Sequence, residues 1–492
     1  MKTLKTNPGA KRLMESLRNM GYDYSTAIAD LVDNSVTAGA SEIYIEINPK
    51  QFARADMIPK QEYRPASIII ADNGKGMSRE ELHEAMRFGT FQEYSSGDLG
   101  KFGLGLKTAS LSQARVLTVF SKAKSGSGIR PRPHYMRWDL DHIYETDDWN
   151  LLIPEENELQ PWEVQALNHD ISKENGTVIL LTNLEGQLSL LSSSDDRERE
   201  KYLARVIDDV SKHLRMVFHR FMQGNVPGHR KLNIYICGTL LEPWDPFCRS
   251  EKTTELDILR IPVILTEEDS SKIEKLVTVS PYILPREEEF SSYAAWKDAS
   301  GPKNWNQQQG LYFYRNNRLI QAGGWSYLRA IDEHTKLLRV AIDFPSELDR
   351  TFTINITKMR AGIPADIREE ISNNVSTWIK LARTRYDNSS STDKPSPSVD
   401  IPVKPGVTTP VPPINPTSTL RVTSTPASVQ TKPTTDDDVN KALRIFYSDQ
   451  ENWTFEQFCK VLIDLLEKIY NKEITSDQIP MQEIKKIFEK KL

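Results

Sequence analysis

A stretch rich in Ser, Thr, Pro and Val divides this 492-residue chain and limits where folded domains can lie. It runs from about residue 387 to 438 and contains SSSTDKPSPSVDIPVKPGVTTPVPPINPTSTL, with few large apolar side chains. Such a composition cannot bury enough apolar surface to offset the entropy lost on ordering, and Pro stiffens an extended chain. We therefore predict a disordered linker over residues 387–438.

Apolar periodicity returns after this linker. Thr454 and Gln457 have the spacing of a capping box, and the apolar residues that follow up to Ile469 have the spacing of one helix face. We predict a small helical module over residues 439–492, suited to docking a protein partner or to self-association. A helical cap that packs on its own chain accounts for the pattern equally well.

Strand and helix patterns alternate before the linker. Ile43–Ile47 alternates as a half-buried strand, and Ala66–Gly74 is a short apolar run that ends in a polar turn. Arg197–Met222 has a helical pattern, and the segment LNIYICG after it again has a strand pattern. We predict an α/β fold, with one domain over residues 1–225 and a second over residues 226–386.

Charge and cysteine content narrow the class of protein. A net charge of −5 argues against a chain that binds nucleic acid over its whole surface, although one basic face is compatible with it. Cys237, Cys248 and Cys459 form no CxxC pair, which favours a reducing compartment and argues against a zinc site. No apolar run has the length of a signal peptide or a membrane span. We expect a cytoplasmic protein with no membrane partner.

Four segments carry candidate chemistry. The first, AIADLVDNSVTAGA, places Asp30 and Asn34 four residues apart on one helix face. A carboxylate that orients water beside an amide oxygen that binds magnesium suits hydrolysis of a phosphoanhydride. The same spacing also occurs on ordinary solvated helix faces.

The second segment, IIIADNGKGMSREEL, delivers Asp72 from a strand into a turn with Gly74 and Gly76. A buried carboxylate can accept a hydrogen bond from an exocyclic amine, and the glycines let the backbone approach a flat ring. Asp-Asn-Gly is also ordinary turn chemistry.

The third segment, GDLGKFGLGLKTASLS, is a glycine-rich loop that runs into a helix, and Lys107 adds a positive charge beside it. Backbone amides and a helix N-terminus together form an anion site. The fourth, NGTVILLTNL, is a Gly176–Thr177 turn that opens a strand. Each of the two is weak when it is taken alone.

In this order and with these gaps, the four segments resemble the signature of the GHKL (Bergerat-fold) ATPases, which include gyrase, MutL, the large Hsp chaperones, histidine kinases and MORC proteins. The resemblance covers about residues 10–385 and is greatest to a prokaryotic MORC/MutL-like branch. It implies an α+β sandwich, in which helices cover one face of an antiparallel sheet and ATP lies under a mobile lid.

The resemblance also implies roles for individual residues in binding ATP and Mg²⁺. It places magnesium on Asn34, the adenine on Asp72 with its Gly74 turn, and close ring contact on Gly76 and Met77. Asp33 would lie near the pocket, and Thr177 would support the water network around the adenine. The lid and phosphate cradle would comprise Gly100, Lys101, Phe102, Gly103, Leu104, Gly105, Leu106 and Lys107.

One position departs from the family pattern. The usual general base is a glutamate four residues before the magnesium-binding asparagine, and here that position is Asp30. Its side chain is shorter by one methylene, and a displacement of about 1 Å can cost roughly a hundredfold in rate. We therefore expect slow hydrolysis catalysed by Asp30, with a non-hydrolysing ATP sensor as the alternative.

The second half extends the resemblance. Gly310–Trp325 resembles the beginning of the S5-like transducer domain of MORC and MutL proteins. Lys358, in RTFTINITKMRAGIP, is the candidate for the lysine that such a domain sends to the γ-phosphate from a strand-to-loop junction, with Arg360 as a neighbouring alternative. An exposed loop lysine is the competing interpretation.

We therefore expect an ATPase that acts as an ATP-gated homodimer on DNA or with a DNA-acting protein partner. Prokaryotic proteins that resemble this chain often belong to restriction or other anti-phage systems. By this analogy we expect a role in defence. A chaperone-like ATPase and an ATP-sensing scaffold are the alternatives. A histidine kinase is not favoured, because no His precedes the first motif to accept phosphate.

Overall fold

The computed structural model divides the chain into two compact units, Met1–Pro397 and Ser398–Leu492. It describes residues 3–4, 6, 8–19, 21–51, 64–89, 99, 104–124, 132–170, 174–266, 272–354 and 361–387. The predicted linker beyond Asp387 and the predicted module over residues 439–492 therefore lie outside the described residues. All described residues belong to the first unit.

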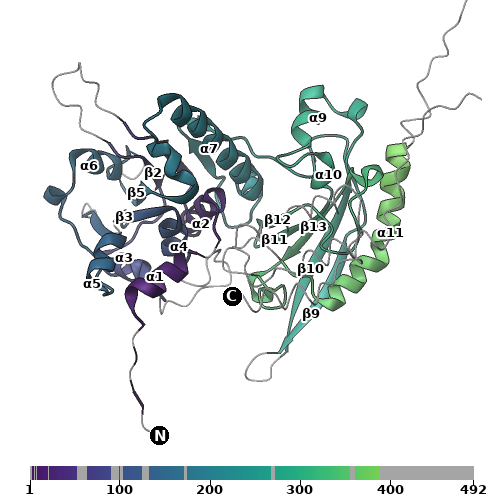
Figure 1. The fold of residues 1–492 in the computed structure, drawn as a ribbon. Coiled ribbons are helices and arrows are strands. Elements are labelled where there is room, and N and C mark those ends of the chain that lie inside the picture. The colour runs from purple at the N-terminus through teal and green to yellow at the C-terminus, as the bar shows by residue number, and fades with distance from the viewer. Residues whose placement is uncertain are drawn as a thin grey trace, which may run out of the picture. The chain divides into compact units, whose positions relative to one another are not determined.

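Two mixed sheets with flanking helices make up the described part of this unit, which confirms the predicted α/β fold class (Figure 1). The first is a seven-stranded sheet in the order β4-β3-β5-β2-β1-β6-β7. Its pairs are antiparallel except for β1 with β6, which is parallel. Its strands are β1 (Glu42–Asn48), β2 (Ser67–Asp72), β3 (Ala114–Lys122), β4 (His134–Asp139), β5 (Gly176–Leu184), β6 (Asn233–Ile236) and β7 (Thr239–Leu240).

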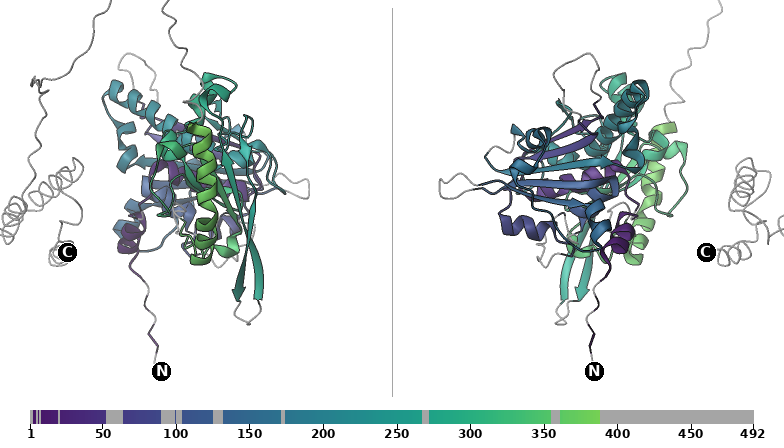
Figure 2. Two further views of the ribbon diagram at one scale, coloured as in Figure 1. Left: turned by 90° about the vertical axis from the view of Figure 1, so that its right-hand side faces the viewer. Right: turned by 60° about the vertical axis from the view of Figure 1, so that its left-hand side comes forward.

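Most helices of this part cover one face of the first sheet (Figure 2). Alternation along β2 sends Ile68 and Ile70 into the large core beneath them, whereas Ile69 and Ala71 join a smaller cluster on the opposite face. Only α6 (Pro161–Leu167), among the labelled helices, packs on that smaller cluster. The covering helices are α1 (Ala10–Arg18), α2 (Tyr24–Thr37), α3 (Arg79–Met86), α4 (Gly105–Gln113), α5 (Leu140–Thr146) and α7 (Asp196–Val217).

Local sequence explains where the key helices begin. Asp23 caps α2, since its side chain accepts from the Thr26 amide at 2.8 Å. Ser78 and Glu81 form a capping box that starts α3. The helix predicted over 197–222 is interrupted at Phe218, which separates α7 from a short α8 (His219–Gln223).

The second sheet has the order β12-β11-β13-β10-β8, and β9 pairs with β10 outside this path. The predicted strand pair after Gly310 is present as β11 and β12. The remaining short helices are η1 (Glu156–Glu158), η3 (Gly186–Ser192), η4 (Glu287–Glu289), α9 (Tyr293–Ala299), α10 (Trp305–Gln308), η5 (Glu333–Thr335) and η6 (Ser346–Leu348). The strands are β8 (Thr254–Glu255), β9 (Leu259–Thr266), β10 (Lys272–Ile283), β11 (Gly310–Arg315), β12 (Arg318–Ala322) and β13 (Leu338–Phe344).

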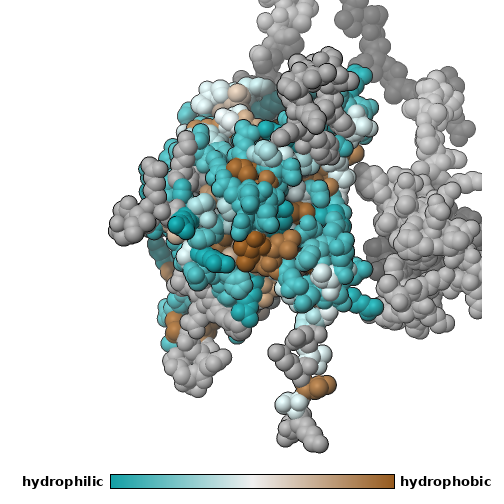
Figure 3. Space-filling model, turned by 90° about the vertical axis from the view of Figure 1, so that its left-hand side faces the viewer, coloured by the Kyte–Doolittle hydropathy of each residue, from teal (hydrophilic) through white to brown (hydrophobic). Residues whose placement is uncertain are grey.

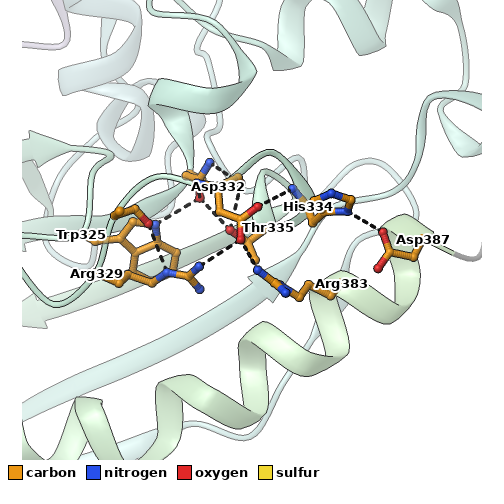
Figure 4. Close-up of polar contacts among 9 residues, drawn as sticks. Trp325, Arg329, Asp332, His334, Thr335, Arg383 and Asp387 are labelled. Carbon is orange, nitrogen blue, oxygen red and sulfur yellow. Dashed lines mark hydrogen bonds and ion pairs between the residues drawn. The ribbon is translucent and has the colours of Figure 1, made fainter. Parts of the chain in front are cut away.

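The long helix α11 (Ala365–Asp387) lies across one face of the second sheet (Figures 1 and 2). Polar contacts fix its last turns to the loop before η5 (Figure 4). Arg383 pairs with Asp332, and His334 Nδ1 lies 2.7 Å from Asp387 Oδ1. These contacts hold the last turns of α11 against the segment that precedes β13.

The opposite face of the second sheet meets the end of α7 and α8. His219 Nε2 lies 2.9 Å from the Tyr314 hydroxyl, and Arg220 pairs with Asp343. Burial lowers the pKa of His219 to about 3, so this imidazole is neutral at physiological pH. The joint between the two sheets is therefore buried and hydrogen-bonded.

The side of the molecule that carries α5 and α6 is largely hydrophilic, with small apolar areas between polar side chains (Figure 3). Areas of this kind are ordinary on folded proteins. Among the helices that the structure describes, none has the length and apolar character needed to cross a bilayer.

Candidate active site

Asp72 lies at the end of β2, on the face of the sheet that the helices cover. Alternation puts it on the same side as Ile68 and Ile70, and only 4% of it is exposed. The Ser35 hydroxyl donates to Asp72 Oδ2 at 2.8 Å, and the Gly74 amide donates to Oδ1 at 2.8 Å. Burial raises the pKa of Asp72, and these hydrogen bonds oppose the shift. The carboxylate is therefore fixed in orientation.

The turn after Asp72 requires glycine for steric reasons. Gly76 has φ +64°, and a Cβ there would come within 1.8 Å of the Lys122 carbonyl oxygen. A Cβ on Gly74 would lie 2.8 Å from the Ala38 Cβ. The turn is thus pressed between β3 and the end of α2. The predicted approach of a flat ring to these glycines stays a prediction.

Thr177 and Met77 belong to one hydrogen-bonded group around this turn. The Ser121 hydroxyl lies 2.9 Å from Thr177 Oγ1 and accepts from the Met77 amide at 2.9 Å. Thr177 pairs directly with Asp72 across β5 and β2. The structure therefore brings the second and fourth sequence motifs together.

The candidate residues of α2 differ in exposure. Asp30 and Asp33 are buried, at 3% and 1%, whereas Asn34 is exposed. The Tyr22 hydroxyl donates to Asp30 Oδ2 at 2.7 Å, and Arg318 of β12 forms ion pairs with both carboxylates. Asp33 therefore lies under the second sheet.

Asp30, Asn34 and Ala38 form a row along α2, because residues four apart share a helix face. The row spans about 12 Å at 1.5 Å per residue. Its Ala38 end touches Gly74 beside Asp72, and its Asp30 end faces the start of α4, where a Cβ on Gly105 would lie 3.9 Å from Asp30 Oδ2. The first three motifs thus line one continuous strip.

Lys107 is almost completely buried in α4, at 2% exposure, and its ammonium donates to the Ala85 carbonyl at 2.8 Å. Burial lowers its pKa to about 8. In this arrangement Lys107 ties α4 to the end of α3. Leu104 and Leu106 are partly exposed at the first turn of the same helix.

Several predicted positions lie outside the described residues. These are Gly100, Lys101, Phe102 and Gly103 of the glycine-rich loop, and Lys358 and Arg360 of the second half. Residues 349–353 form a turn, and residues 355–360, which contain the predicted strand-to-loop junction, lie outside the described residues. The predicted roles of all six residues stay predictions.

Sequence reasoning missed four polar partners of the site, namely Tyr22, Ser35, Ser121 and Arg318. Ser35 follows Asn34 directly, so its position beside the motif was a usable signal. Tyr22, Ser121 and Arg318 lie outside the four motifs, and only the tertiary fold brings them to the site.

The strip suits a magnesium nucleotide. Asn34 offers an exposed amide oxygen, and Mg²⁺ usually takes only one or two protein ligands while phosphates and waters complete its shell. Within the part of the chain that the structure describes, no cluster of three His, Cys, Asp or Glu residues forms a metal cage of its own. A metal here would therefore depend on the phosphates of its ligand.

Comparison with known proteins identifies a family match for the part of the chain that contains this strip. Residues 22–177 match the family model of histidine kinase-, DNA gyrase B- and HSP90-like ATPases. Protein MICRORCHIDIA 5 of Arabidopsis thaliana is 25% identical over 132 residues, which cover 26% of this chain and 17% of that protein. Protein MICRORCHIDIA 4 of the same plant is 24% identical over 210 residues, which cover 35% of this chain and 25% of the relative.

Two solved structures resemble the chain at low identity. The N-terminal domain of a DNA repair protein has 14% identity and a TM-score of 0.37, and the match covers 77% of this chain and 98% of that one. The ATPase and transducer domains of DNA topoisomerase II from Balamuthia mandrillaris have 13% identity and a TM-score of 0.35, with 74% and 85% covered. From the family model and the MICRORCHIDIA relatives, residues 22–177 are a GHKL ATPase domain, and the chain is MORC-like.

Proposed function

We propose that the chain binds ATP with Mg²⁺ and hydrolyses it slowly. The observation that carries this proposal is the strip along α2, with the Asp72 turn at one end and Asp30 beside the start of α4 at the other. The strip is about 12 Å long, so the adenine would lie at its Asp72 end and the phosphates at its Asp30 end.

Asp72 would recognise the adenine. Its carboxylate accepts from Ser35 and the Gly74 amide, and a carboxylate has further lone pairs for the exocyclic amine of the base. Gly76 would bring the backbone of the turn close to the ring, and its own Cβ position is filled by the Lys122 carbonyl of β3. Thr177 and Ser121 would order the water that reaches the ring nitrogens.

The opposite end would hold the phosphates and the attacking water. Bound Mg²⁺, with Asn34 as its protein ligand, would neutralise charge on the phosphate oxygens. The start of α4 directs backbone N–H groups toward the same place. Asp30 would orient the water and accept its proton, and Tyr22 would hold the carboxylate in position.

We further propose that ATP closes two protomers into a dimer and that hydrolysis reopens them. This gate would act on DNA or with a protein partner bound through residues 439–492, in the cytoplasm. The resemblance to MORC and MutL proteins supports these steps, and the role in anti-phage defence rests on that resemblance alone.

A non-hydrolysing ATP sensor is the second candidate, and one observation favours it. Tyr22 and Arg318 already engage the two oxygens of Asp30, at 2.7 and 3.4 Å, and the carboxylate is shorter than the usual glutamate. A protein whose candidate base is held in this way could bind ATP without activating the attacking water.

Turnover measurements separate the two candidates. Phosphate release with Mg²⁺ and ATP is compared for the native protein, Asp30→Ala and Asp30→Glu, and ATP binding by each is measured calorimetrically. We expect slow native turnover, none with Asp30→Ala, and retained binding in all three. Binding without native turnover establishes the sensor, and unchanged turnover in Asp30→Ala rules out Asp30 as the base.

A further inference from the structure

A groove with a volume of about 600 Å³ lies beside the second sheet, between α9 and the loop at 243–251. Trp244 and Cys248 of the loop line one wall, and Phe290 and Ala299 line the other. These four residues are buried in the fold, and Ala295 of α9 is half-buried beside them. This α9 groove is therefore a concave surface with apolar walls.

Buried hydrogen bonds hold the two walls of the α9 groove at a fixed separation. Arg339 is completely buried, and its two terminal nitrogens donate to the Pro246 carbonyl at 2.6 Å and to the Ala299 carbonyl at 2.7 Å. The Trp244 indole donates across the groove to the Asp298 carbonyl at 2.9 Å. A ligand that binds here meets a preformed surface, so little free energy is lost in ordering the walls.

Charged side chains line the rim of the α9 groove. Asp245 accepts from Arg249 Nε at 2.7 Å, so these two charges oppose each other. Glu251 accepts at 2.8 and 2.7 Å from a backbone amide and a hydroxyl, which are both uncharged donors. Asp298 is exposed, and its carboxylate lies 3.6 Å from Arg215. The rim is acidic on balance and favours a ligand that carries a positive charge.

The last turn of α11 contacts the chain on both sides of the α9 groove. Arg385 Nη2 donates to the Lys252 carbonyl at 3.1 Å and to Glu289 Oε2 at 3.0 Å. Each of these two partners is next in sequence to a residue that lines the groove. In agreement with these contacts, α9 and the last turns of α11 lie at the same end of the second sheet (Figure 1). The chain after Asp387 therefore starts beside the groove.

The sequence that follows α11 suits such a surface. Residues 388–397 read NSSSTDKPSP, in which Lys394 is the one cation and two prolines follow it. Proline favours the polyproline II conformation, which loses little entropy on binding, and proline-containing segments dock on aromatic-lined grooves. Lys394 is seven residues beyond Asp387, and an extended chain of that length spans up to about 25 Å. The segment is thus long enough to reach the groove.

We propose that the α9 groove is the docking site for residues 388–397 of the same chain. The two prolines would lie against the apolar walls, and the ammonium of Lys394 would face the carboxylates of Glu251 and Asp298. A segment of this composition has no core of its own and becomes ordered only by packing on a folded surface. Because its attachment is close to the groove, its effective concentration is on the order of millimolar, so a weak contact is sufficient.

The test is zero-length cross-linking of the full chain with a carbodiimide, which joins an amine to a carboxylate that touches it. We expect mass spectrometry to find Lys394 linked to Glu251 or Asp298 in preference to Glu287 and Glu288, which are exposed on nearby η4. A segment that does not dock would link to all four carboxylates without preference. Equal yields would therefore overturn the proposal.

Two variants of α9 form a matched pair. Ala295→Trp places a large side chain on a residue that lines the groove, and should lose the preferred link. Ala294→Trp makes the same change at an exposed neighbour outside the lining, and should keep the link. An undiminished link in a folded Ala295→Trp protein would overturn the proposal.

A third variant and a labelling experiment complete the test. Pro395→Ser/Pro397→Ser should also lose most of the preferred link, and it decides the question if Ala295→Trp fails to fold, because it changes no residue of the groove. Cross-linking a mixture of ¹⁵N-labelled and unlabelled protein identifies the source of the segment. Links within one chain support the proposal, whereas links that join labelled to unlabelled chains would assign the groove to a second copy and overturn it.

Discussion

Asp72→Asn should weaken ATP binding strongly while leaving the turn intact. The amide keeps Oδ1 as the acceptor for Gly74, and the Ser35 hydroxyl can rotate to accept from the new amide group. The substitution removes the negative charge and turns one accepting oxygen into a donor. The exocyclic amine of adenine, itself a donor, would then face the donating NH₂ group of the new side chain, and no hydrogen bond can form between them.

The expected loss follows from the type of hydrogen bond. At 4% exposure Asp72 is shielded from water, so a ligand hydrogen bond to its charge should contribute about 1.5–3 kcal/mol. At 1.4 kcal/mol for each factor of ten, the dissociation constant for ATP should rise about 10- to 150-fold. Specificity should change as well, because inosine carries an oxygen where adenosine carries the amine. The native protein should prefer ATP to ITP, and Asp72→Asn should lose or reverse that preference.

Titration calorimetry with Mg²⁺ and non-hydrolysable analogues of ATP and ITP measures both effects. Glu163→Gln serves as the control, since Glu163 is a buried carboxylate of α6, on the opposite face of the first sheet, paired with Arg137. It should bind both analogues as the native protein does. Native affinity for the ATP analogue in a folded Asp72→Asn protein would refute the placement of the adenine.

Other predictions concern the turn, the buried lysine, the pH dependence of binding and the assembly. Gly89 has a positive φ but open space around it, so Gly89→Ala should lower the free energy of unfolding by about 1–2 kcal/mol in a urea titration. Gly76→Ala should lower it further, because the Lys122 carbonyl must also move. Since burial lowers the pKa of Lys107 to about 8, the native protein should gain stability over Lys107→Met between pH 8 and about 10.4; equal pH slopes would contradict this. Because burial raises the pKa of Asp72, affinity for ATP should increase as pH rises through that value and stay level in Asp72→Asn. A non-hydrolysable ATP analogue should double the mass in light scattering; a protomer mass under every nucleotide condition would exclude the gate.

The sequence predicted the elements of the fold well where one face of an element had to be buried. The alternation in Ile43–Ile47 and the apolar run before Asp72 are strands β1 and β2, because each residue type matches the side of the sheet it faces. Boundaries were less accurate. The helical pattern over 197–222 continues through Phe218, where the structure separates α7 from α8, and the ring of Phe218 is buried in the core of the first sheet.

Within the candidate site, the local motifs were predictable and their neighbours were not. Gly76 could be identified from its place in the turn after Asp72, whereas its contact with β3 is known only from the structure. The exposure of Asn34 and the burial of Asp33 could not be separated from sequence, since adjacent helix residues differ only by what packs on them. Lys107 was expected at the phosphates, and the structure shows its ammonium on the Ala85 carbonyl.

The contact of Arg318 with α2 has a consequence for how the two sheets depend on each other. Separating Arg318 from Asp30 and Asp33 is costly, because breaking a buried ion pair removes attraction that offset the desolvation of its charges. Any movement that withdraws β12 from α2 must therefore break both ion pairs. The carboxylate at the phosphate end of the strip is therefore held in part by a side chain of the second sheet. Coupling between the sheets would in this way be carried by charge, in addition to any lysine that reaches the γ-phosphate.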